Sequence, residues 1–182
     1  MKNLIFSLLI SGISATVLAQ TSTVPKFPID SASKKITFTE VVQQTGIKDT
    51  LYNRAIHWCN IFFKNAQSVT TKRDKEDGIV EGKPKFKVFK AATSKDTTKI
   101  MAGFISFTFT IACKENRYKY TITDLNLKGV SYFPLERWLN KKDPAYSAEC
   151  DNYLVQVDNY MQDLIKSIKK GMLEAVKKKD VW

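Results

Sequence analysis

The stretch from Gly103 to Leu125 constrains the fold more than any other, because apolar and polar side chains alternate along two consecutive segments. A period of two is typical of half-buried β-strands. With a turn at Glu115 and Asn116, the apolar residues of the two segments fall opposite one another. The expected cross-strand pairs are Cys113 with Tyr118, Ile111 with Tyr120, and Phe109 with Ile122. A slip of one residue would turn one apolar side to water, so the register is strongly specified.

Three more segments are predicted as strands, namely residues 35–43, 68–73 and 79–89. The Asp77-Gly78 pair between the last two suits a tight turn, because these residue types accept a positive φ. Pro84 lacks a backbone donor, which indicates an edge or a bulge at that point. The central hairpin and these segments together predict a sheet of five strands.

Two segments repeat apolar residues at the spacing of three and four that marks one face of a helix. The first runs from Asp49 to about Asn65, and the second covers residues 148–178. Residues 131–146, which are rich in aromatic side chains, are expected to cross over the core. An antiparallel sheet with both helices on one face buries every apolar stripe at once. The predicted fold class is therefore α+β, in the order strand, helix, four strands, helix.

The first nineteen residues show the pattern of a secretory signal peptide, with a basic start and an apolar run from Leu4 to Leu18. Cleavage is expected after Ala19, and a membrane anchor that is never cleaved is the alternative. Residues 20–34 are expected as an extended leader and residues 35–182 as a single domain. No transmembrane segment is expected after cleavage, so the protein is expected in the periplasm or outside the cell.

Three cysteines, Cys59, Cys113 and Cys150, follow the predicted cleavage site. Export permits a disulfide, but the odd number leaves at least one thiol unpaired within the chain. The apolar neighbours of Cys59 and Cys113 favour a role as small buried hydrophobic residues. A disulfide between Cys150 and one of the other two cysteines is the alternative.

A set of four motifs resembles an exported bacterial domain-of-unknown-function family, number 4468, which is described as having a TBP-like fold and is typical of Bacteroidetes-type bacteria. The motifs are FPIDSASKKITFTEVV, DTLYNRAIHW, the Asp77-Gly78 turn and KENRYKYTITDL. The resemblance is close over residues 27–128 and looser over the C-terminal helix at 148–178. Where the family usually has a glycine in the tight turn, this chain has Glu115-Asn116. The resemblance implies a TBP-like β-α-β4-α fold and implies no activity, substrate or catalytic residue.

Signatures of catalysis are missing from the sequence, which has no GxSxG, HExxH or CxxC motif and no glycine-rich phosphate loop. His57 is the only histidine, and no metal-ligand spacing accompanies it. Glu40 lies on the otherwise apolar side of its strand, where it is either a buried acid with a raised pKa or the partner of a lysine. A hydrolase acting through Glu40 and His57 is the weakest alternative. We expect no enzymatic activity, no metal and no cofactor.

The other face of the predicted sheet is rich in lysine and threonine. The chain has a net charge of +11, which favours anionic partners, although export argues against nucleic acid. TBP binds DNA with the exposed face of such a sheet. The likeness between TBP and this chain concerns the fold alone, and a shared fold does not imply a shared ligand. The candidate binding residues are Lys83, Lys85, Lys87, Phe89, Phe104, Thr108, Lys119 and Thr121. The expected function is a non-catalytic binding module for an anionic envelope component or a protein partner, and a merely solvated face is the alternative.

A second function from another class is a carrier of a small apolar ligand. Its cavity would lie between sheet and helices, lined by Phe107, Phe109, Tyr120, Trp58 and Met161. A well-packed core would explain the same residues without a ligand.

Overall fold

The computed structural model describes residues 24–91, 98–129 and 132–173, so the predicted signal peptide lies outside the described residues. Seven strands and four helices occupy this part of the chain. In order they are β1 (Phe38–Gln43), α1 (Lys48–Phe62), α2 (Ala66–Val69), β2 (Thr70–Asp74), β3 (Ile79–Gly82), β4 (Lys85–Phe89), β5 (Met101–Lys114), β6 (Arg117–Lys128), β7 (Tyr132–Pro134), α3 (Glu136–Leu139) and α4 (Ala148–Leu173). None of the helices in these ranges has the length and apolarity needed to span a bilayer.

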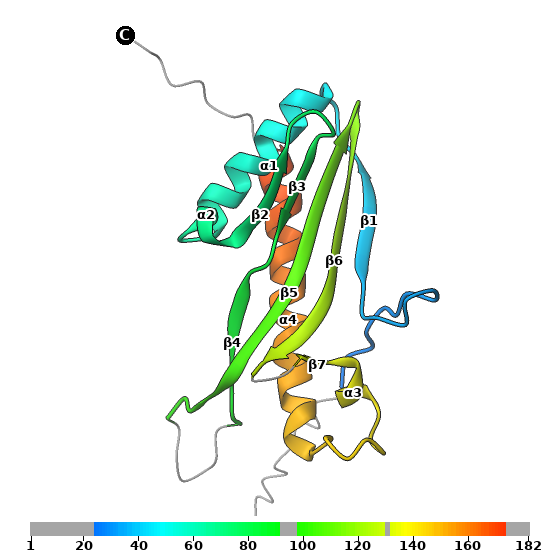
Figure 1. Ribbon diagram of the computed structural model, residues 1–182, viewed down its shortest axis with the longest axis vertical. Coiled ribbons are helices and arrows are strands. Elements are labelled where there is room, and N and C mark those ends of the chain that lie inside the picture. Colours follow the sequence, from blue (N-terminus) through cyan, green and yellow to red (C-terminus); the bar gives the residue numbers. More distant parts are fainter. Residues whose placement is uncertain (1–23, 92–97, 130–131, 174–182) are drawn as a thin grey trace, which may run out of the picture.

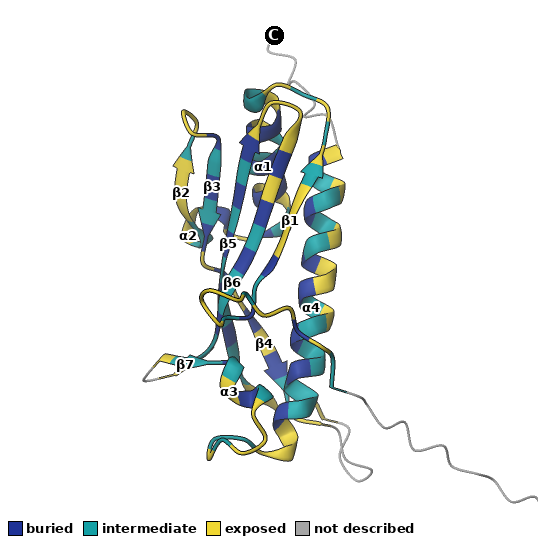
Figure 2. Cartoon of the chain, turned by 90° about the vertical axis from the view of Figure 1, so that its right-hand side faces the viewer, coloured by how far each residue is buried: buried dark blue, intermediate teal, exposed yellow. Residues whose placement is uncertain are grey.

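One antiparallel sheet contains all seven strands, with β5 and β6 at its centre (Figure 1). The main order is β1-β6-β5-β3-β2, while β4 pairs with β5 and β7 pairs with β6. The two long helices, α1 and α4, cover one face, and the opposite face is open (Figures 1 and 2). The predicted α+β class with two helices on one side of the sheet is confirmed.

The central hairpin has the predicted register. Cys113 pairs with Tyr118, Ile111 with Tyr120, and Phe109 with Ile122. Asn116 takes the left-handed conformation in the turn, with φ of 54°, which asparagine tolerates better than most residues. All six paired side chains are buried against the helices.

A β-bulge in β6, which the sequence analysis did not predict, interrupts this pairing at Asp124. Ser106 pairs with Asn126 and Thr108 with Thr123, so one residue of β5 faces two of β6. Asp124 has φ of 56°. The extra residue restores the inward direction of Leu125, which strict alternation would turn to water.

The segment predicted as a single strand at 79–89 is divided into β3 and β4, both paired with β5. Pro84 marks the break, because it has no N–H for a ladder. Its carbonyl accepts hydrogen bonds from the Phe107 N–H at 3.2 Å and the Ser106 hydroxyl at 3.3 Å. The predicted irregularity at Pro84 therefore takes the form of a full interruption.

The helix layer packs on the apolar side of the sheet through aromatic and aliphatic side chains. The ring of Trp58 on α1 meets that of Phe109 edge to face, with centroids 5.6 Å apart. The Trp58 indole N–H donates to the Ser167 hydroxyl at 2.9 Å, which links α1 to α4. The buried stripe of α4 contains Leu154, Val157, Met161, Leu164, Ile168 and Met172. Residues 174–178, the predicted end of this helix, lie outside the described residues.

The described part of the predicted leader packs onto the domain. Phe27 is buried, with its ring centroid 6.2 Å from that of Phe38. Ile29 forms a β-bridge with Ile36 across a turn in which Asp30 accepts bonds from Ser33. These contacts carry the chain into β1 and fix its starting point.

The three cysteines are free thiols and are buried. Burial raises the pKa of Cys59 and that of Cys113 to about 12. The bridge to Cys150 that the sequence left open is not formed.

Candidate functional site

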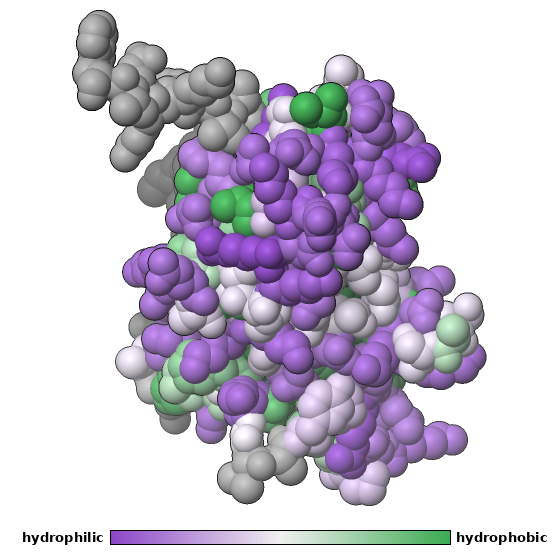
Figure 3. All heavy atoms as spheres, turned by 45° about the horizontal axis from the view of Figure 1, so that its top comes forward, coloured by the Kyte–Doolittle hydropathy of each residue, from purple (hydrophilic) through white to green (hydrophobic). Residues whose placement is uncertain are grey.

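The open face of the sheet carries rows of hydroxyl side chains across its central strands. Thr39 pairs with Thr121, which in turn pairs with Thr110, and Thr123 pairs with Thr108. The hydroxyls of Thr39 and Thr121 lie 3.2 Å apart. Figure 3, which brings the top of the molecule forward, shows mainly hydrophilic residues on this side. β-branched residues support the strands here while presenting hydroxyls to solvent.

Two adjoining hollows cross the lower part of this face and share Lys83, Ser106 and Lys128, so we describe them as one transverse groove. Their volumes are about 450 Å³ and about 460 Å³. The first extends from the shared residues to Lys64 and Asn65 at the end of α1. The second extends the other way. Its remaining lining residues are Lys35, Phe107, Thr108, Asp124, Asn126 and Tyr132.

One half of the transverse groove is strongly basic. Lys64, Lys83, Lys85 and Lys128 are all exposed there. Within the described ranges, none of these four lysines forms an ion pair. The Lys85 ammonium lies 4.9 Å from the centre of the Phe104 ring, a cation–π contact that leaves its charge in place. Four uncompensated cations therefore surround this half.

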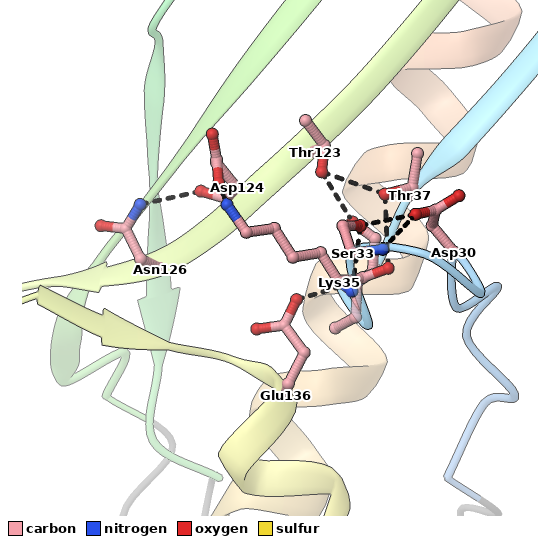
Figure 4. A network of polar contacts seen from close by, with 9 residues as sticks. Asp30, Ser33, Lys35, Thr37, Thr123, Asp124, Asn126 and Glu136 are labelled. Carbon is pink, nitrogen blue, oxygen red and sulfur yellow. Dashed lines mark hydrogen bonds and ion pairs between the residues drawn. The ribbon is translucent and has the colours of Figure 1, made fainter.

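The other half of the groove is polar and locally neutral (Figure 4). The Lys35 ammonium contacts the carboxylate of Asp124, which raises the pKa of Lys35. The Asn126 side chain donates to the carbonyl of Asp124 at 2.8 Å, and the Glu136 carboxylate accepts from the Ile36 N–H at 2.7 Å. This network fixes the bulge of β6 against the chain leading into β1.

The candidate residues from the sequence fall into three places. Lys83, Lys85 and Thr108 line the transverse groove. Lys87 is exposed beside it, paired in register with Phe104.

Phe89 lies apart from the groove, at the edge where β4 meets α4. Its N–H donates to the Gln156 side chain at 3.0 Å, and its carbonyl accepts from Asn152 and Gln156.

Thr121 and Lys119 belong to the upper half of the open face. The Thr121 hydroxyl bonds to Thr39, and Lys119 borders a separate hollow of about 260 Å³ near the hairpin turn. Val41, Ala112, Lys114, Arg117 and Tyr118 complete that hollow. The structure therefore divides the candidate set among the groove with its margin, the edge where β4 meets α4, and the hairpin end.

Several groove residues were missed from the sequence, among them Lys35, Lys64, Lys128 and Tyr132. Lys128 is directed to the open face because the bulge at Asp124 changes which positions of β6 point outward. The sequence does carry a signal for this change. The apolar positions Tyr118, Tyr120 and Ile122 are even-numbered, whereas Leu125 and Leu127 are odd-numbered.

The structure corrects one of the two expectations for Glu40. The residue is exposed, so it is not a buried acid with a raised pKa. Its carboxylate accepts from the Lys169 ammonium at 2.7 Å and from the Tyr120 hydroxyl at 2.7 Å. These bonds, that of Lys169 first, hold the pKa of Glu40 below its ordinary value. The structure confirms the other interpretation, in which Glu40 pairs with a lysine.

His57 lies in a small hollow of about 170 Å³ between α1 and α4, beside Trp58, Ser167 and Lys170. No hydrogen bond of the described residues joins His57 to Glu40.

The residues expected to line a ligand cavity contact one another or neighbouring rings. The Phe63 ring stacks on Phe109 at 5.6 Å, and the Phe107 ring lies 6.0 Å from that of Tyr160. Met161 is fully buried. These contacts favour a packed core over a ligand chamber.

An antiparallel sheet with two helices on one face and an open basic face on the other defines an α+β protein of the TBP-like class. The family model described as "Domain of unknown function (DUF4468) with TBP-like fold" matches residues 38–128, and the chain belongs to this family. No curated protein matches the chain.

Two solved structures show the same fold. A DUF4468 family protein from Bacteroides ovatus superposes with a TM-score of 0.64 at 12% identity, covering 84% of this chain and 93% of that one. A TBP-like protein from Parabacteroides distasonis superposes with a TM-score of 0.52 at 16% identity, covering 78% of this chain and 96% of its own. At these identities the likeness concerns the fold alone.

Proposed function

We propose that this protein is a non-catalytic, exported binding module that uses the open face of its sheet to bind an anionic component of the cell envelope. One observation carries the proposal. The face that no helix covers holds a groove bordered by four lysines without ion pairs among the described residues.

Charge of one sign gathered in a concave site attracts a ligand of the opposite sign. Each ammonium there is exposed, so binding an anion costs little desolvation of the protein. The carboxylate nearest the groove, Asp124, is already paired with Lys35 and opposes an anion only weakly.

Export is part of the proposal and rests on the signal-peptide pattern of residues 1–19. An exported protein meets acidic polymers and lipid headgroups of the envelope, whereas nucleic acid is mostly intracellular. We therefore place the protein in the periplasm or outside the cell, with an acidic envelope polymer as its partner.

The test is binding of the mature chain to immobilised dextran sulfate as a function of salt concentration. Changing Lys83, Lys85 and Lys87 together to Glu replaces two of the four groove cations and the neighbouring Lys87 with anions. We expect the wild-type protein to bind at low salt and release as salt screens the charges, and the triple variant to lose binding.

A matched control changes Lys142, Lys166 and Lys170 to Glu. This variant has the same net charge as the groove variant, but its substitutions lie in the α3–α4 loop and on α4. We expect this control to keep most of the binding. Equal losses in both triple variants would show that net charge alone is responsible and would remove the open face as the binding site.

A further inference from the structure

We infer that the transverse groove is built for an acidic glycan, with an anionic group of the glycan in its basic half and sugar hydroxyl groups in its polar half. This inference rests on the proposed function and specifies its ligand. It depends on the unequal chemistry of the two halves, which a site for a simple polyanion would not need.

The basic half offers point charges to a carboxylate, sulfate or phosphate. Lys83 lies in the link between β3 and β4, Lys128 is the last residue of β6, and both border the two hollows. An anion placed between them meets two ammonium groups at once. Lys64 and Lys85 add further charge on the side of α1.

The polar half offers hydrogen-bonding groups without net charge. Thr108, Asn126 and the Lys35–Asp124 pair provide donors and acceptors together. Sugar hydroxyls need both kinds of partner, whereas a bare polyphosphate needs donors only. Acceptors in this half therefore favour a ligand that carries hydroxyl groups.

Tyr132 supplies an aromatic surface at the far end of the groove. Its side chain borders the second hollow, and the residue is 61% exposed although it belongs to a paired strand. Its register partner is Lys128, so the two side chains leave the sheet on the same face, and both residues line the second hollow. An aromatic ring can pack against the C–H face of a sugar while a neighbouring lysine binds its acidic group.

Calorimetric titration of the mature chain at low salt tests this assignment with three probes: tetragalacturonate, its neutral counterpart tetragalactose, and inorganic polyphosphate. We expect tetragalacturonate to bind and tetragalactose to bind far more weakly. Lys128→Gln should weaken both anionic probes about tenfold. Tyr132→Ala should weaken tetragalacturonate about fivefold and leave polyphosphate unchanged.

Lys166→Gln, the same change on the exposed side of α4, is the matched control and should bind like the wild-type protein. Two results would overturn the glycan assignment: Tyr132→Ala weakens neither probe, or polyphosphate binds and tetragalacturonate does not. In either case the groove recognises charge only, and the proposed function stands. If neither anionic probe binds, both are overturned.

Discussion

Charged side chains in this protein have two roles that their contacts distinguish. Glu40 is held between Lys169 and Tyr120, and so it ties the edge strand β1 to the far end of α4. Lys83 and Lys128 border the groove, and no carboxylate among the described residues neutralises them. The first kind stabilises the fold, and the second kind is available to a ligand.

Glu40→Gln should lower the free energy of unfolding at neutral pH by about 0.5 kcal/mol, because the pair is half exposed. The pKa of Glu40 is lowered in the folded protein relative to its ordinary value of 4.5. Its contribution is thus present above that value and is lost as the pH falls through the folded pKa. Urea unfolding of both proteins at several pH values should show a difference that is complete at neutral pH and shrinks as the pH falls below 4.5. A difference that is the same at neutral pH and in acid strong enough to protonate the carboxylate would contradict the role given to Glu40.

The three thiols should be unreactive in the folded protein. Burial raises the pKa of Cys59 and Cys113 to about 12, so hardly any thiolate forms near pH 8, and Cys150 is shielded as well. Titration with dithionitrobenzoate should detect no thiol in the native state and all three in guanidinium chloride. Detection of a single thiol after denaturation would reveal a disulfide and contradict the structure.

At the scale of single elements, the bulge in β6 decides which residues reach the open face. It lets Ile122 and Leu125 both point to the helices while Asn126 and Lys128 point outward. Asp124 adopts a positive φ, which costs most for β-branched side chains. The bulge thus depends on the residue type at this one position.

Asp124→Val should destabilise the protein by about 1–2 kcal/mol, because valine is strained at this φ and cannot pair with Lys35. Asp124→Asn is the matched control, since asparagine accepts the same φ and loses only the exposed ion pair. In thermal unfolding, the wild-type protein should have the highest midpoint temperature, Asp124→Asn a slightly lower one and Asp124→Val clearly the lowest. Equal stability of the two variants would show that the bulge does not depend on the backbone preference of residue 124.

The sequence was a good guide to the hairpin and to the helices, because strict alternation and helical spacing report directly on which side is buried. It was a poorer guide to the groove. Lys64 and Tyr132 are single residues in short connections, and nothing in their local pattern predicts that folding brings them to Lys83 and Lys128. Sites formed by distant segments depend on the full path of the chain.

At the scale of the whole molecule, the central feature is the division of roles between the two faces of the sheet. The helix-covered face is filled by rings such as Trp58, Phe109 and Phe107, and it gives the domain its stability. The open face carries hydroxyl, amide and ammonium groups. Hydrophilic residues predominate on this side in Figure 3. A ligand can therefore bind there without disturbing the core.

The most direct test of this division is to follow the backbone amide resonances of the mature chain while polyphosphate is added at low salt. We predict that the largest shifts occur at Lys83, Lys85, Ser106 and Lys128, and that amides in the middle of α4 stay unchanged. Shifts centred on α1 and α4, with the outer strand residues unaffected, would contradict the account by placing the binding surface on the helices.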